Sequence, residues 1–227
     1  MKNFLFIVVL FFFSACSIKT VNPEILEAKN YKIAAMEYFK NEEDKKAIKY
    51  LKKAFKIYAK YDDIDNEVKV LLLLAKIDNE NAIKYLTLAN SFFNYVDNKL
   101  KEEIKFTNAL INKNKKEMIK LSKIATSNKI KALAKIYLFK WSKNLKYLKD
   151  FRYNKKDYIY SFYLYEKSSL MEPKNRVILL KQALEIDKNL QIKKFIKRDL
   201  KALYNAYKQI DNKKALIYKI RLELIND

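Results

Sequence analysis

The chain contains no glycine among its 227 residues and only two prolines. Glycine tolerates positive φ and close backbone approach, so the chemistries that depend on a glycine loop are excluded. Among them are the phosphate-binding P-loop, the dinucleotide-binding fingerprint and the nucleophile elbow. Turns must be built from other residues, and we expect Asn and Asp to supply part of the left-handed backbone that glycine normally supplies.

The body of the chain, from Asn22 onward, shows helical spacing of its apolar residues and no strand pattern. The sequence Asn22-Pro23-Glu24 is typical of a helix start, and Pro173 is expected to open another helix. Polar clusters rich in Asn and Asp separate the helical stretches and can cap the helix that follows. The expected helices span residues 23–41, 44–61, 65–77, 80–96, 98–112, 115–126, 129–141, 143–152, 157–171, 174–187, 190–208 and 212–225.

Catalytic side chains are scarce. The chain has no His and a single Cys, which excludes Ser-His-Asp triads, Cys-His pairs, the commonest zinc sites and an intrachain disulfide framework. The carboxylates cluster in turns or beside Lys, where they serve as helix caps and solvated ion pairs. We therefore expect no enzyme, no metal site and no cofactor, and the sequence indicates no small-molecule substrate.

The formal net charge is +22, from 48 Lys and Arg against 26 Asp and Glu. Such an excess favours an anionic partner, either nucleic acid or a charged surface. The same abundance of Lys, Asn, Ile, Tyr and Phe is also what the codon usage of an AT-rich genome gives. Both explanations of the charge stay open.

The first sixteen residues form a leader. A short basic head, residues 1–3, precedes an unbroken apolar run over residues 4–13, which as a helix reaches only about 15 Å. That length is about half of the hydrocarbon thickness of a bilayer, so the run fits a signal peptide better than a membrane span.

The leader ends in Phe13-Ser14-Ala15-Cys16, which resembles the lipobox of bacterial lipoproteins, although Phe13 stands where Leu is usual. The resemblance implies a signal peptide over 1–15, cleavage before Cys16 and acyl chains on that residue, followed by a lipidated tether over 16–22. Ser17 follows the cysteine, which in the sorting rule of many such lipoproteins favours the outer membrane, facing the periplasm. The alternative is an ordinary secretory leader in which Cys16 is incidental.

A small-large-small pattern recurs in the body at intervals of about 35 residues. It is formed by Ala47, Leu51 and Ala54, then by Ala82, Leu86 and Ala89, and more weakly by Met118, Ser122 and Ala125. Small residues at this spacing let two helices approach closely, while the large residue fills the groove between them.

Tyr31, Ala34, Ala35 and Tyr38 precede Ala47 at the spacing of the tetratricopeptide pattern, and segments 183–188 and 203–216 resemble further parts of such repeats. The body, 23–227, therefore resembles a tetratricopeptide or related α-α repeat array. The resemblance implies an all-α fold of about a dozen helices, in which antiparallel pairs stack as an α-solenoid. A helical bundle without repeats is the alternative.

Candidate partner-binding residues follow from this repeat register. Arg198, Lys201, Asn205 and Lys208 share one face of a helix, and in the register that helix is the first of a pair, whose face lines the groove. Lys201 and Asn205 resemble part of the carboxylate-gripping arrangement that some tetratricopeptide domains use, and we place Lys29 and Lys32 on the corresponding face of the first repeat. The alternative is an ordinary solvated Lys face.

The segment 153–165 is dense in Tyr and interleaved with Lys, a composition that can stack nucleobases or line a groove. The alternative, which we favour, is that its tyrosines pack between helices. Because the leader implies export, we expect no nucleic-acid partner.

The sequence therefore favours a lipid-anchored scaffold of the cell envelope that binds a protein partner through a helical-repeat groove. By analogy with lipoproteins of this build, it would assist the assembly of an envelope complex. The alternative is a binder of anionic envelope polymers, lipopolysaccharide or peptidoglycan, through the basic surface.

Overall fold

The computed structural model of the protein describes residues 22–153 and 155–225, and over these residues the fold is all-α, with no strand. Two of the expected helix starts, at Pro23 and Pro173, are confirmed. The helices are α2 (Pro23–Lys40), α3 (Asp44–Lys60), α4 (Ile64–Ile77), α5 (Ala82–Ser91), α6 (Asn98–Ile111), α7 (Lys115–Ile124), α8 (Asn128–Ser142), the 3₁₀ turn η1 (Leu145–Tyr147), α9 (Tyr158–Ser168), α10 (Pro173–Asn189), α11 (Lys193–Tyr207) and α12 (Asn212–Leu224).

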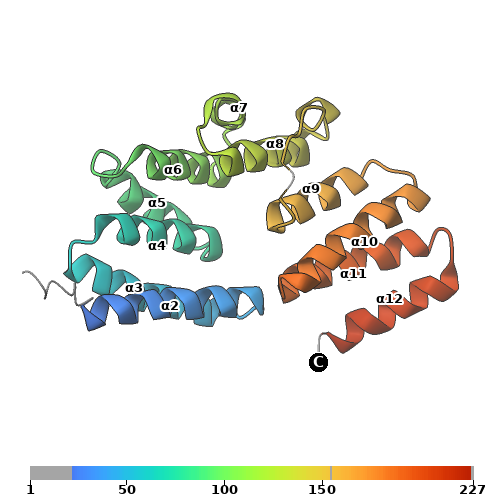
Figure 1. Cartoon of the computed structure of the whole chain (residues 1–227), viewed down its shortest axis with the longest axis horizontal. Coiled ribbons are helices and arrows are strands. Elements are labelled where there is room, and N and C mark those ends of the chain that lie inside the picture. The colour runs from blue at the N-terminus through green and yellow to red at the C-terminus, as the bar shows by residue number, and fades with distance from the viewer. Residues whose placement is uncertain (1–21, 154, 226–227) are drawn as a thin grey trace, which may run out of the picture.

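The helices form a solenoid of antiparallel neighbours, as expected (Figure 1). Besides these neighbours, α4 packs against α6, α6 against α8, and α8 against α9. Two side-chain hydrogen bonds link further helices to this row. Lys32 of α2 donates to Asn66 of α4, and Arg198 of α11 donates to Ser161 of α9. A continuous layer therefore consists of α2, α4, α6, α8, α9 and α11, which we call the inner layer because it lines the cavities described below.

Small residues at the helix crossings explain the close packing. Of the alanines in the recurring pattern, Ala47, Ala54 and Ala89 are completely buried and Ala82 is 6% exposed. Leu51 and Leu86 lie between them in the core, so the small-large-small pattern marks the packed faces of α3 and α5 as predicted.

Polar side chains cap seven of the described α-helix starts, whereas Glu43 before α3 and Asn81 before α5, in two of the expected polar clusters, form no side-chain cap. At each capped start a side-chain oxygen accepts a hydrogen bond from a backbone N–H in the first turn, which would otherwise lack a partner. The capping residues are Asn22, Asp63, Asp97, Asn114, Ser127, Asp157 and Asp211.

Four helices end in the same left-handed turn, at Glu42, Asp62, Lys113 and Gln191, whose φ values are 66°, 54°, 50° and 54°. At each turn the next residue's N–H bonds a carbonyl five residues back, as in Asn114 N–H to the carbonyl of Ala109, at 2.9 Å. Only one of the four residues is Asp and none is Asn. The expectation that Asn and Asp supply such turns is therefore confirmed at Asp62 alone.

The expected helix over 143–152 is wrong. Lys143 adopts left-handed backbone (φ 53°) directly after α8 and ends it, and Asn144 then caps the short turn η1. The segment between η1 and α9 has no regular structure among its described residues. As a result α9 follows α8 in the inner layer without a full outer helix between them.

The tyrosine-rich segment packs between helices. Phe151 stacks on Tyr163 with ring centroids 4.0 Å apart, and Phe162 of α9 meets Tyr137 of α8 edge-on at 5.3 Å. Ile159 and Leu164 are buried beneath these rings. This packing follows the interpretation favoured from the sequence.

The solenoid curves so that the turn between α2 and α3 lies beside α11, the penultimate helix (Figure 1). Lys197 of α11 pairs with Glu42, and Lys194 lies 3.5 Å from a carboxylate oxygen of Asp44. The ammonium of Lys194 also lies 4.8 Å above the ring of Phe39 at the end of α2. These contacts join residues about 150 positions apart in sequence and close the curve.

A candidate basic binding cavity

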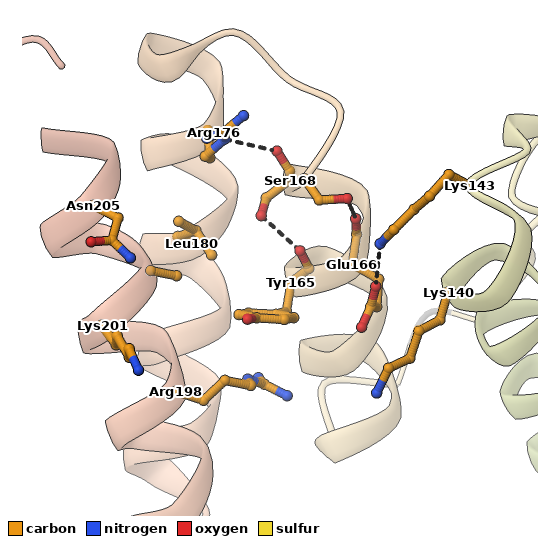
Figure 2. A pocket seen from close by; sticks show the side chains of 12 residues that line it. Lys140, Lys143, Tyr165, Glu166, Ser168, Arg176, Leu180, Arg198, Lys201 and Asn205 are labelled. Atoms are coloured by element: carbon orange, nitrogen blue, oxygen red, sulfur yellow. Dashed lines mark hydrogen bonds and ion pairs between the residues drawn. The ribbon is translucent and has the colours of Figure 1, made fainter.

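A cavity of about 630 Å³ opens between α8, α9, α10 and α11. Basic side chains approach it from two sides, α11 on one and the end of α8 on the other (Figure 2). Five cationic residues line it against one carboxylate, Glu166. The lining residues are Lys140, Lys143, Tyr165, Glu166, Ser168, Ser169, Arg176, Leu180, Arg198, Lys201, Ala202 and Asn205.

Three of the four residues that the sequence singled out on α11 line this cavity: Arg198, Lys201 and Asn205. They lie three or four residues apart, which puts them on one side of the helix. Lys201 and Asn205 are exposed, so their polar groups are available to a ligand. Lys208 does not line the cavity; its ammonium lies 5.6 Å from the ring of Tyr204.

Lys29 and Lys32 lie on α2 and are not part of this cavity. Lys29 is exposed, whereas Lys32 is half-buried and donates a hydrogen bond of 3.2 Å to Asn66. Burial lowers the pKa of the Lys32 ammonium. The structure thus joins Lys32 to the packing of α2 on α4, and it does not bring the two lysines together with the α11 residues.

Arg198 forms a rigid part of the cavity. Its guanidinium pairs with Asp187 at 3.0 Å and with Asp199 at 2.9 Å. It is also held between two rings, 4.1 Å from the centroid of Tyr165 and 4.9 Å from that of Phe195. With its side chain 20% exposed, Arg198 presents a fixed positive surface to the cavity.

The two carboxyls behind Arg198 are completely buried. Burial raises the pKa of Asp187 and raises that of Asp199 to about 8, and one oxygen of each carboxyl, Oδ1 of Asp187 and Oδ2 of Asp199, has no hydrogen-bond partner among the described residues. Ser161 donates a hydrogen bond of 2.6 Å to Asp187. Burial therefore favours the protonated form of Asp199, while the guanidinium of Arg198 opposes this by favouring the ionised form.

The side of the cavity formed by α8 is less constrained. Lys143 pairs with the buried Glu166 at 3.3 Å, while Lys140 lies 5.5 Å from the ring of Phe162. Among the described residues, neither Lys140 nor Lys201 takes part in an ion pair. Arg176 stabilises the turn between α9 and α10, because its guanidinium donates hydrogen bonds to the carbonyls of Ser168 and Met171.

The cavity presents hydrogen-bond donors and positive charge to an anion. Lys140, Lys201 and the amide of Asn205 can donate to a carboxylate, and Arg198 supplies a fixed charge beside them. Within residues 22–153 and 155–225, no three His, Cys, Asp or Glu side chains are grouped so that they could hold a metal ion.

Sequence reasoning missed the contribution of α8 and the buried carboxyl pair. Lys140 and Lys143 look like any other exposed lysine, because only the superhelix brings them opposite α11. The carboxyl pair did leave a signal: Asp187 follows Ile186, Asp199 precedes Leu200, and both fall on the apolar faces of their helices. A charge at a core position indicates a buried partner.

No protein family, curated protein or solved structure matches this chain.

Proposed function

We propose that the protein is a lipid-anchored scaffold of a bacterial cell envelope that binds an acidic segment of a partner protein in the basic cavity. The observation that supports this proposal is the convergence of Arg198, Lys201 and Asn205 with Lys140 across one cavity. A volume of about 630 Å³ accommodates a few residues of a peptide, such as an acidic side chain or a chain end.

The binding chemistry is non-covalent. Arg198 is held in place before the partner arrives, so little ordering entropy is lost when it binds. Lys140 and Lys201 are free to adjust and supply charge-assisted hydrogen bonds, each worth about 1.5–3 kcal/mol. The neighbouring Tyr165 ring and Leu180 offer apolar contact to the stem of an acidic side chain.

The leader supports the membrane attachment. Cys16 and the segment 1–21 lie outside the described residues, so the anchor is proposed from the lipobox resemblance alone. Every described helix is too short or too polar to cross a bilayer. Two or three acyl chains on Cys16 would hold the protein durably, since one chain binds only marginally.

The experiment is a crosslinking pull-down from intact cells that express the full-length protein. Lys201→Glu places a negative charge in the cavity and should remove the captured partner, while Lys208→Glu makes the same charge change just after the end of α11, outside the cavity. Both variants should keep the helical circular dichroism of the parent. Equal capture by Lys201→Glu and the parent would refute the proposed site, and equal loss in both variants would show that binding follows overall charge.

A further inference from the structure

A second cavity, of about 550 Å³, lies on the inner layer and is lined by residues of α4, α6, α8 and the start of α9. Its volume falls in the range of small-molecule sites. The lining residues are Lys76, Lys99, Glu103, Phe106, Ser127, Asn128, Lys129, Leu133, Arg152, Tyr153, Lys155 and Tyr158.

Basic residues outnumber carboxylates five to one in the lining of this second cavity, where Glu103 is the carboxylate and attracts the ammonium of Lys76. Its five basic residues are Lys76, Lys99, Lys129, Arg152 and Lys155, and none of them forms an ion pair with a described residue. The first cavity differs, because three of its five cations are held by carboxylates or backbone carbonyls. Five cations around one enclosed space repel one another, and a bound anion would remove that repulsion.

Partial enclosure of the cavity strengthens the positive electrostatic field of these five basic residues. Lys76 is exposed to water, yet the surrounding inner layer partly desolvates its ammonium and lowers its pKa. A multiply charged anion is therefore the ligand that gains most from binding here. A phosphate monoester carries up to two negative charges at neutral pH, against one for a carboxylate.

The N-terminus of α8 lies at one edge of the cavity. Its residues Ser127, Asn128 and Lys129 line the cavity, and the positive end of the helix dipole lies there. The carboxylate of Glu102 already binds this end, accepting the backbone N–H groups of Thr126 at 2.6 Å and Ser127 at 3.1 Å. Glu102 therefore already satisfies these two backbone donors and offsets part of the helix dipole, so the charge available to a ligand comes from the basic side chains.

The other lining side chains are mostly aromatic. Phe106, Tyr153 and Tyr158 lie in the lining with Leu133, and they offer ring faces rather than further charge. Partial enclosure raises the pKa of Tyr158 to about 12, so its hydroxyl stays protonated and can donate to a ligand. Aromatic ring faces can pack against the C–H groups on one face of a sugar ring beside the charged group.

We propose that this second cavity binds a small phosphorylated ring compound of the sugar phosphate class. Lys76, Lys129 and Arg152 hold the phosphate group, and the aromatic side chains contact the ring. The site is separate from the partner-binding cavity and does not depend on it.

Isothermal titration calorimetry on the full-length protein in a neutral detergent at low salt tests the proposal. The probes are glucose 1-phosphate, inorganic phosphate, glucose and acetate. Glucose 1-phosphate should bind saturably with one site per chain, inorganic phosphate more weakly, and glucose and acetate far more weakly. Lys76→Gln and Lys129→Gln should each weaken binding of glucose 1-phosphate by about tenfold, because each removes a charged donor.

Lys156→Gln is the matched control, since Lys156 is exposed, lies in the same part of the chain and does not line the cavity. It should bind glucose 1-phosphate like the parent, and circular dichroism should show all three variants folded. The proposal is overturned if glucose 1-phosphate does not saturate the protein, or if Lys156→Gln weakens binding as much as the cavity variants do. Equal affinity for acetate would overturn the phosphate preference, and equal affinity for inorganic phosphate would overturn the role of the ring.

Discussion

A glycine placed at Lys113 should stabilise the protein. Lys113 lies just after α6 with φ of 50°, in the left-handed position where glycine is the usual residue. The backbone there is fixed by two hydrogen bonds, from Lys113 N–H to Leu110 at 3.3 Å and from Asn114 N–H to Ala109 at 2.9 Å. Its exposed side chain has no hydrogen bond or ion pair with a described residue, so the substitution changes little besides the backbone.

The magnitude follows from two opposing terms. Left-handed backbone costs an L-residue about 1–2 kcal/mol, which glycine does not incur. Glycine in turn loses more freedom on folding, at a cost of about 0.5–1 kcal/mol. Taking the middle of both ranges, the net gain for Lys113→Gly is about 0.75 kcal/mol, which raises the Tm of a chain of this size by about 1.5–3 °C.

The assay is thermal and urea unfolding followed by circular dichroism, with Lys120→Gly as the control. Lys120 is an exposed lysine inside α7, where the same change should cost about 1 kcal/mol. Combining Lys113→Gly with Asp62→Gly and Gln191→Gly should give about 1.5–3 kcal/mol, since the three turns are far apart and their effects add. If Lys113→Gly lowers the Tm as Lys120→Gly does, the reasoning about left-handed turns is refuted.

Three further predictions concern the core, the buried carboxyls and the leader. Ala54→Leu should overpack a completely buried crossing and cost about 1–3 kcal/mol, and an unchanged melting temperature would contradict the packing of α3. Asp199 binds its proton more tightly in the folded chain, with a pKa of about 8 against 3.8 for the free side chain, so its ionisation should lower stability as pH rises from about 4 to 8. Asp199→Asn has no titratable group at this position, so only the parent should lose stability from this source as pH rises. The urea midpoint of the variant minus that of the parent should therefore increase between pH 5 and pH 8. A difference that stays constant with pH would show that Asp199 does not titrate in this range. Cys16→Ser should abolish labelling by a fatty-acid probe and leave an uncleaved precursor, and unchanged labelling would exclude Cys16 as the acylation site.

Local interactions explain why so much of the helical structure follows from the sequence. The helix starts at Pro23 and Pro173 and the caps at Asp63 and Asn114 depend on residues within one turn of each other. The burial of Ala47 and Ala54 follows from helical spacing of small side chains. The one expected helix that is wrong, over 143–152, failed because the left-handed backbone at Lys143 carries no glycine to mark it.

The sequence by itself determined the helical fold, most helix boundaries, the buried alanines and the basic face of α11 with Arg198, Lys201 and Asn205. Only the tertiary structure decided that Lys140 of α8 faces this helix, that Lys32 takes part in the packing of α2 on α4, and that five basic residues line a second cavity. The physical reason is the sequence distance over which the interactions act. Caps and periodicity act over a few residues, whereas each cavity depends on the curvature of the whole solenoid, which is the sum of many small rotations between packed helices.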